Sequence, residues 1–524
     1  MICIQCSSPF EVTAADRAFY DKISPVIAGQ KCGIPDPTLC HDCRLQRRLV
    51  WRNERHLYHR TCSKTGQPLI SWIAPDKPHP VYKKEIWWGD SWNALDYEHD
   101  VDFSKPFFPQ LEALIKKVPF IDMLVDNAFN SDYANFCNNV KDCYLLYASN
   151  NDQNSHYSSY IWGCNDYMDC LQAFDCQFCY DCMDVNNCYN TSYSKNCTNV
   201  SDSYFCENCQ NCQSCFGCVN LVGKKYHFMN QHRLKFPMRF AQIINCQDCT
   251  GDSLKNCKNV KEGYDSAGIE DCKWILIGGK PVKDCYDVTG AEVTELSYES
   301  VVTGIPTTHT YFSAYAWKNA HDILYSVLCP GSQNCFGVVG LKRGKHCILN
   351  KQYSKGDYET LVLKLIQHMR KTGEWGAFLP VNLSPFDYNE TLANGYFSMS
   401  REDVLKRGWR WREKELKEYK PSEYKAPDSL ADVKDDILQQ VISCKECGKN
   451  YRLISQELVF YRIHQIPVPE NCPDCRHTAR MNRRNPRRLW SSACAKCAAP
   501  IQTTYPPERP EIVYCEACYL KEVY

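Results

Sequence analysis

The chain has 524 residues, enough for three or four domains. Lys plus Arg and Asp plus Glu both number 61, so the formal net charge is zero, which excludes a protein that coats nucleic acid or an anionic membrane over its whole surface. There are 36 cysteines, no basic-then-apolar signal segment at the start, and no apolar stretch long enough to cross a bilayer. We therefore expect a cytoplasmic protein with no membrane contact, whose reduced thiols point to metal binding.

Cysteine density divides the chain into segments. Residues 1–62 contain six cysteines, residues 137–347 contain twenty-two and residues 444–518 contain eight, whereas the intervening stretches contain none. We expect a multi-domain, mainly β protein made of the following parts: a zinc module at 1–90, an aromatic connector at 91–130, a β-solenoid at 131–350, a helical connector and charged linker at 351–440, and a second zinc module at 441–524.

Two Cys-x-x-Cys pairs occur in the first segment and again in the last. They are Cys3/Cys6 with Cys40/Cys43, and Cys444/Cys447 with Cys472/Cys475. From the second pair onward the two segments align without a gap at an offset of 432 residues, which indicates an internal duplication. Four thiolates on two such pairs suit tetrahedral Zn²⁺, so each set predicts a structural zinc site.

The middle of the chain repeats a short template, as in Val140-Lys-Asp-Cys-Tyr144 and Val282-Lys-Asp-Cys-Tyr286. Asn139, Asn199 and Asn259 lie 60 residues apart, and residues 165–218 align as three rows of 18. This self-similarity predicts stacked units of about 18–22 residues, about ten coils in all, in a parallel β-helix of undetermined handedness. Stacked Asn amides should bond to one another at the turns, and small thiols should fill a narrow interior.

The repeat columns allow more than one interpretation. The run from Cys206 to Cys218 resembles iron–sulfur spacing without its usual Pro, so a reduced structural ladder is favoured over a metal site or a cluster. The column Asp166, Asp184 and Asp202 could act on a carbohydrate, although Asp in a repeat column is usually a turn residue.

Two helices are expected in the connector after the solenoid. Tyr358 to Met369 has apolar residues at helical spacing and Gly373 is a natural stop. A second helix should begin at Ser400, with Asp403 completing a capping box. Charge dominates residues 413–436, which indicates a linker.

The last segment contains one further predicted site, formed by Cys494, Cys497, Cys515 and Cys518. The matching residues of the first segment are Cys62, Thr65, Lys83 and Ile86, so three of the four ligands are missing there. We expect that second N-terminal site to be empty and the chain to bind three zinc ions.

The motif Cys-x-x-Cys, then Phe-Glu-Val-Thr, Phe-Tyr and Pro-x-Pro-Thr-Leu-Cys-His-Asp-Cys-Arg, resembles the zinc-ribbon, or treble-clef, domain of small bacterial proteins. The whole chain, including Leu383-Ser-Pro-Phe-Asp-Tyr-Asn-Glu-Thr391, is similar to uncharacterised zinc-ribbon proteins of candidate-phyla bacteria. The resemblance implies a treble-clef fold and a metal, and it implies no reaction.

Three arginines follow the second cysteine pair in each module, at a spacing of four that places them on one face of a helix. They are Arg44, Arg48 and Arg52, and Arg476, Arg480 and Arg484. They could contact phosphates of RNA or the ribosome, with Trp51 and Trp490 stacking on bases, or they could pair with acidic residues of the solenoid. We expect a non-enzymatic scaffold whose modules contact a protein or RNA, with a carbohydrate-acting β-helix enzyme as the alternative. The oligomeric state cannot be read from the sequence.

Overall fold

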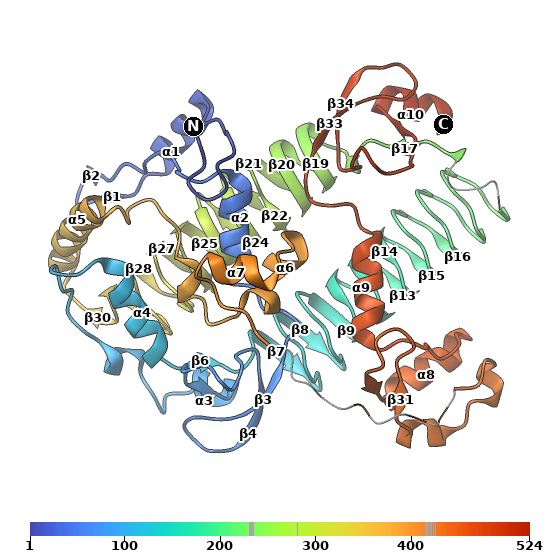
Figure 1. The fold of residues 1–524 in the computed structure, drawn as a ribbon, viewed down its shortest axis with the longest axis horizontal. Coiled ribbons are helices and arrows are strands. Elements are labelled where there is room, and N and C mark those ends of the chain that lie inside the picture. The colour runs from blue at the N-terminus through green and yellow to red at the C-terminus, as the bar shows by residue number, and fades with distance from the viewer. Residues whose placement is uncertain are drawn as a thin grey trace.

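The computed structural model describes residues 1–229, 235–279, 281–413, 419, 422, 424 and 426–523. The fold is mainly β, with about 18 turns of β-solenoid and small cysteine-rich modules at the two ends of the chain (Figure 1). Lys414, Glu415, Lys417 and Glu418 of the expected linker lie outside the described residues.

The solenoid repeat is 12 residues, not the 18–22 expected. Each strand pairs in parallel with the strand one coil later, as where Ser159 lies opposite Leu171. Every third residue of the coil has a positive φ, for example Asp166, Asp169 and Gln172. A coil is therefore a square of four short sides, and the left-handed residue turns each corner. Asn and Asp tolerate this conformation best, which explains their abundance. The rows of 18 are one and a half coils, and they align because the same chemistry recurs every three residues.

The corners are joined by side-chain ladders. The amide of Asn127 donates to Asn139 (2.6 Å), and Asn139 donates to Asn151 (3.0 Å). Asn187 donates to Asn199 in the same way (2.8 Å). The predicted stacking of Asn amides at the turns is therefore confirmed.

Small side chains occupy the interior and bond to the backbone. Cys182 is typical: its thiol donates to the carbonyls of Tyr180 (3.4 Å) and of Thr191 in the next coil (3.2 Å). Its own N–H donates to the Sγ of Cys170, one coil earlier (3.4 Å). Such thiols satisfy buried backbone groups while filling a core too narrow for larger residues. The solenoid cysteines thus form the structural ladder that the repeats favoured.

The coils form two stacks rather than one rod. The first solenoid, residues 125–228, contains a 10-stranded parallel sheet and continues as isolated bridges. Its strands are β7 (Val125–Phe129), β8 (Cys137–Lys141), β9 (Asn150–His156), β10 (Ser159–Trp162), β11 (Asn165–Met168), β12 (Leu171–Phe174), β13 (Gln177–Tyr180), β14 (Met183–Asn186), β15 (Tyr189–Ser192) and β16 (Ser201–Tyr204).

The second solenoid, residues 243–352, contains a 13-stranded sheet. Its strands are β18 (Ile243–Ile244), β19 (Gln247–Lys255), β20 (Lys258–Ala267), β21 (Ile269–Lys273), β22 (Leu276–Gly278), β23 (Val282–Lys283), β24 (Tyr286–Glu295), β25 (Tyr298–Tyr311), β26 (Ala314–Trp317), β27 (Ala320–Leu324), β28 (Gln333–Phe336), β29 (Lys345–Ile348) and β30 (Lys351–Gln352). Among the described strands of this sheet, only β30 is antiparallel to its neighbour, and it closes the last coil.

The two solenoids lie side by side and run in opposite directions. Hydrogen bonds join the two stacks, and the residue numbers increase along the first stack while those of their partners decrease along the second. The pairs are Asn150 with Glu292, Gln172 with Asp265, and Asn186 with Lys255. The expected single rod of about ten coils is therefore wrong, and the structure is a hairpin of two shorter rods.

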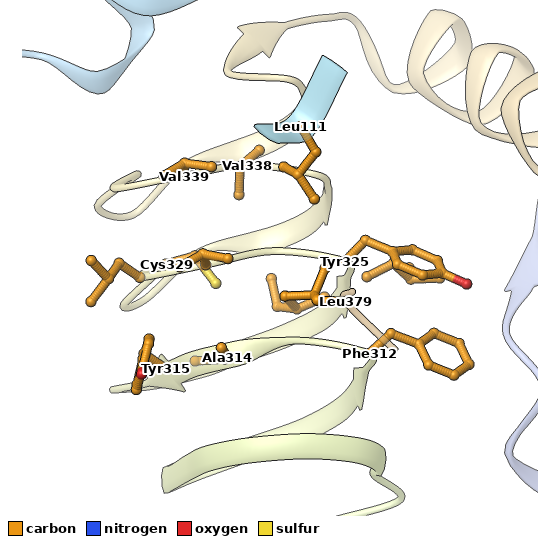
Figure 2. Close-up of a cluster of buried hydrophobic side chains, with 14 of the residues drawn as sticks. Leu111, Phe312, Ala314, Tyr315, Tyr325, Cys329, Val338, Val339 and Leu379 are labelled. Carbon is orange, nitrogen blue, oxygen red and sulfur yellow. The ribbon is translucent and has the colours of Figure 1, made fainter. Parts of the chain in front are cut away.

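Helices cover the closed end of the second solenoid. They are α4 (Phe107–Lys117) and α5 (Lys355–Thr372). Figure 2 shows Phe312 and Tyr325 on successive coils, one above the other, with their ring centroids 4.9 Å apart. Leu111 of α4 and Leu379 complete this buried cluster. Beside it, Phe107 packs against Phe336, with ring centroids 5.3 Å apart.

The remaining helices of the connector confirm the expected start and stop signals. Helix α5 ends at Gly373, which has the left-handed φ of 76° that a C-cap favours. Helix α7 (Arg401–Lys406) begins at Ser400, whose hydroxyl accepts from the N–H of Asp403 (3.1 Å). The Asp403 carboxylate accepts from that hydroxyl (2.9 Å) instead of from the Ser400 backbone N–H, so the expected capping box is only half formed. The short helices α6 (Leu392–Tyr396), η3 (Val381–Leu383), η4 (Tyr388–Glu390), η5 (Leu430–Asp432) and η6 (Asp435–Gln439) complete this region.

The two end modules contain the same elements in the same order. In the first these are α1 (Ala14–Ile23), α2 (His41–Leu49), β3 (Tyr58–Thr61), β4 (Pro68–Ser71), β5 (Val81–Tyr82) and α3 (Lys84–Trp88), with β1 (Val26–Ile27), β2 (Gln30–Lys31) and η1 (Ala94–Tyr97) as additions. In the last they are α8 (Ser455–His464), α9 (Pro473–Arg483), β33 (Trp490–Ala493), β34 (Pro500–Thr503), β35 (Val513–Tyr514) and α10 (Glu516–Val523), after β31 (Ile442–Ser443) and β32 (Asn450–Tyr451). Among the helices of the described chain, none has both the length and the apolar character needed to cross a bilayer.

Candidate metal centres and their attachment to the solenoids

The twelve predicted metal ligands come together as three separate quartets. They are Cys3, Cys6, Cys40 and Cys43; Cys444, Cys447, Cys472 and Cys475; and Cys494, Cys497, Cys515 and Cys518. Within each quartet all four sulfur atoms lie within 4.8 Å of one another. Sγ–Sγ distances of 3.7 Å (Cys6–Cys40), 3.8 Å (Cys447–Cys472) and 3.7 Å (Cys497–Cys515) match the edge of about 3.8 Å of a tetrahedron with Zn–S bonds of about 2.3 Å.

Each first pair stands on a tight backbone turn. The N–H of Cys444 donates to the carbonyl of Lys449 (2.9 Å), and Gly448 donates back to Cys444 (2.9 Å). Gly448 has a φ of 72°, and Ala498, the equivalent residue of the third quartet, has a φ of 58°. This turn aims two thiols and several N–H groups at one point, which is where a metal would lie.

The same turns favour thiolate over thiol. Burial raises the pKa of Cys444, but backbone N–H groups of Cys472, Cys447 and Glu446 outweigh burial and lower the pKa to about 6. The pKa of Cys494 is lowered to about 6 for the same reasons. Thiolate is the form that binds metal, so the turn prepares Cys444 and Cys494 for it. Burial and the neighbouring Cys447 thiol instead raise the pKa of Cys472 to about 11, so the second pair is not prepared in this way.

The position predicted to be empty keeps the turn without the ligands. Cys62 donates its N–H to Gln67 (2.8 Å) and accepts from Gly66 (2.8 Å), as in the three quartets. Lys83 instead donates to the side chain of Gln67 (3.1 Å). Among the described residues, Cys62 belongs to no group of potential ligands. The turn at Cys62 thus keeps the duplicated fold through hydrogen bonds within the protein, without four thiol ligands.

Helix α2 of the first module is attached to the second solenoid through buried charges. Arg44 pairs with Asp287 (2.8 Å) and Glu299 (3.3 Å), and Arg48 pairs with Asp287 (3.0 Å) and Glu299 (3.4 Å). The side chains of all four residues are at most 2% exposed. The guanidinium of Arg44 also lies over Trp274, 4.7 Å from the ring centroid.

Helix α9 of the last module is attached to the first solenoid in the same way. Arg476 pairs with Asp169 (3.2 Å), and Arg480 pairs with Asp169 (2.9 Å) and Asp181 (3.4 Å). Arg476 lies over Tyr157, 4.9 Å from its ring centroid.

The two attachments use one recurring column on the solenoids. An aromatic residue and two acidic residues occupy the same left-handed corner on three successive coils. These are Tyr157, Asp169 and Asp181 in the first solenoid, and Trp274, Asp287 and Glu299 in the second. In each helix the earlier arginine covers the aromatic ring and the later one bridges the acids. We call this set the aromatic–acid–acid column.

Each module contacts one solenoid through its helix and the start of the other solenoid through a strand, an arrangement that we call crossed. Strand β5 of the first module pairs in parallel with β6 (Phe120–Ile121), just before the first solenoid, although α2 is attached to the second. Strand β35 of the last module pairs in parallel with β17 (Met238–Arg239), just before the second solenoid, although α9 is attached to the first. Each module therefore holds both solenoids, and the same set of contacts occurs twice.

The electrostatics of these columns depend on mutual neutralisation. Burial would raise the pKa of Asp287, but the charges of Arg44 and Arg48 outweigh burial and hold that pKa below its ordinary value. A carboxyl group with a lower pKa in the folded state stabilises the fold above its unfolded-state pKa of about 3.9. That contribution is lost as the pH falls through the depressed folded-state pKa.

The third arginine of each stripe is also internal. Arg52 is 3% exposed and pairs with Glu54 (2.6 Å), and the side chain of Arg484 is 7% exposed, 3.7 Å from Asp265. Trp51 is fully buried. Arg44, Arg48, Arg476, Arg480 and Arg484 pair with acidic residues of the solenoids, which supports that alternative over phosphate contact, whereas Arg52 pairs with Glu54 of its own module. The sequence did not show which acids, because identical Asp corners occur throughout the repeat.

The three Asp residues suggested for carbohydrate chemistry are turn residues and do not form one column, because a spacing of 18 residues is one and a half coils and places Asp184 at a different corner from Asp166 and Asp202. Asp166, Asp184 and Asp202 all have positive φ. Asp166 and Asp202 accept hydrogen bonds from the amides of Asn154 and Asn190, one coil earlier. These contacts belong to the corner ladder.

Comparisons of the chain with protein-family models, with curated proteins and with solved structures gave no match. The resemblance to zinc-ribbon proteins therefore rests on the sequence motifs, and the cysteine quartets are what the structure adds to it.

The quartets predict the metal content. Elemental analysis of the purified, tag-free protein should give three zinc ions per chain. Cys475→Ser should reduce this to two, because the second quartet would keep only three of its four thiolates. Cys62→Ser should leave three, because Cys62 belongs to no quartet. A zinc content near zero, or a loss on replacing Cys62, would contradict the assignment.

The columns predict a large stability effect. Arg48→Ala and Arg480→Ala should each lower the free energy of unfolding by about 3–5 kcal/mol, because buried carboxylates lose their partner. Arg17 pairs with Asp36 at the surface (side chains 57% and 33% exposed), so Arg17→Ala should lower the free energy of unfolding far less than either of these. Denaturant unfolding would measure all three, and equal small effects would argue against the attachment described here.

Proposed function

We propose that this protein is a non-enzymatic scaffold in which zinc shapes two end modules so that they clamp a hairpin of β-solenoids. One observation carries the proposal. The quartets that contain Cys3 and Cys444 each include the first residues of a helix, α2 or α9, and the arginines of that helix contact an aromatic–acid–acid column. A set of four thiolates leaves no open coordination position for a substrate or water. Structural zinc is therefore the role that the ligand chemistry favours.

The metal ligands and the arginines that contact the column lie one after the other on the same helix. Cys40 is the N-cap of α2 and Cys43 lies in its first turn, so a metal at this quartet would fix where the helix starts and points. Arg44 and Arg48 follow within the next turns of the same helix. The direction set by the metal is what places both guanidinium groups on the acids.

The partner that we propose is a protein. The six arginines of the two stripes are held in buried ion pairs, which weakens the case for a nucleic acid. An aromatic ladder on the first solenoid instead offers an apolar surface: Phe205 is 50% exposed, Phe216 41% and Phe228 71%. Their ring centroids lie 5.3 Å (Phe205–Phe216) and 5.4 Å (Phe216–Phe228) apart. Contiguous exposed rings of this kind are typical of protein-binding surfaces.

The proposed setting is the cytoplasm, because quartets of free thiolates require a reducing compartment.

Affinity purification of the full-length protein from its native cells tests the partner. Wild type should retain a defined protein that ribonuclease does not release, and Phe205→Ser/Phe216→Ser should lose it, because the apolar surface becomes polar. Phe129→Ser is the matched control, since Phe129 is 67% exposed on β7 of the same solenoid.

Both variants should keep three zinc ions, which separates lost binding from lost folding. Release by ribonuclease would instead favour RNA, and equal retention by the double variant would remove the aromatic ladder as the binding surface.

A further inference from the structure

A cavity of about 180 Å³ lies between the two solenoids, independent of the metal centres and of the aromatic ladder. Its walls come from both stacks: Phe136, Ala148 and Trp162 from the first, and Ile277, Val302 and Trp317 from the second. This volume accommodates one aromatic ring with a small substituent, since a cavity of about 150 Å³ holds benzene.

Arg52 brings an incompletely paired charge to this cavity. Its Nη2 pairs with Glu54 (2.6 Å), but Nε and Nη1 have no hydrogen-bond partner among the described residues. The residue is 3% exposed and its guanidinium lies 5.4 Å from the ring centroid of Phe136. A buried donor without a partner is costly, so an acceptor bound in the cavity would stabilise Arg52.

A glycine keeps this donor accessible. A Cβ on Gly290 would lie 2.3 Å from Nη1 of Arg52, so a side chain here would displace the guanidinium. The equivalent corner of the first solenoid, three residues after Asp169 as Gly290 is three after Asp287, carries Gln172. Gln172 accepts a hydrogen bond from Arg487 (3.1 Å). One half of the duplicated structure thus fills the corner with an amide, and the other half leaves it open.

A second polar group lines the cavity. Asn150 donates its amide to Glu292 (2.9 Å), while its buried Oδ1 has no partner in the part of the chain that the structure describes. The cavity therefore offers one unused guanidinium donor and one unused acceptor within walls that are mostly apolar and that also include Glu292 and the Lys318–Asp126 ion pair.

We propose that this cavity binds a small aromatic carboxylate that carries a hydroxyl group. The carboxylate accepts from Nη1 of Arg52, the hydroxyl donates to Oδ1 of Asn150, and the ring packs between Phe136 and the tryptophans. A carboxylate matches the guanidinium, because charge-assisted hydrogen bonds of this kind are stronger than neutral ones.

Calorimetry with the zinc-loaded, full-length protein tests the proposal, with 4-hydroxybenzoate and phenol as probes. We expect saturable binding of 4-hydroxybenzoate and at least about tenfold weaker binding of phenol, which lacks the charged acceptor. Gly290→Gln should weaken 4-hydroxybenzoate at least about tenfold, since the new amide would occupy the corner as Gln172 does.

Gly223→Gln is the control, because Gly223 is also a left-handed corner (φ 63°) but has no atom within 4 Å of its Cβ position. Its binding should equal that of wild type, and circular dichroism and zinc content should show that both variants fold. Absence of saturable binding, equal affinity for phenol, or unchanged binding by Gly290→Gln would overturn the proposal and leave ordered water as the occupant.

Discussion

Buried arginine–carboxylate pairs between a module helix and a solenoid corner are the interaction on which this architecture depends. Removing these charges from water is expensive unless each finds its partner with good geometry. Residues four apart on a helix are separated by about 6 Å along its axis, and neighbouring coils by about 4.8 Å. Arg44 and Arg48 can therefore bridge Asp287 and Glu299 only if the helix crosses the stack at the right place. That requirement links the cysteine quartets to the solenoids.

The crossed arrangement gives these pairs their structural consequence. A module that bound only one solenoid would leave the two stacks free to separate. Here β5 extends the start of the first solenoid while α2 is attached to the second, and β35 and α9 make the reciprocal contacts. The duplicated end modules and the two similar stacks thus form one set of contacts made twice. The cavity beside Arg52 marks a place where the two copies differ, with Gly290 opposite Gln172.

Much of this could be predicted from the sequence because it depends on local spacing. The three quartets, the internal duplication, the Asn ladder and the C-cap at Gly373 all follow from residue types at fixed intervals. The coil length could not be obtained in this way, because interior and corner residues recur every three positions and several longer periods fit equally well. The acidic partners of Arg44 and Arg480 could not be predicted from the sequence either. Their partners, Asp287 and Asp169, look like every other corner Asp until the coils are stacked and the helices are placed.

Hydrogen–deuterium exchange with and without a zinc chelator measures the central claim most directly. If zinc positions the helices that hold the solenoids, chelation should deprotect the backbone amides of residues 157–181 and 274–299 as well as those of the end modules. Loss of protection confined to the modules, with both aromatic–acid–acid columns unchanged, would contradict the account.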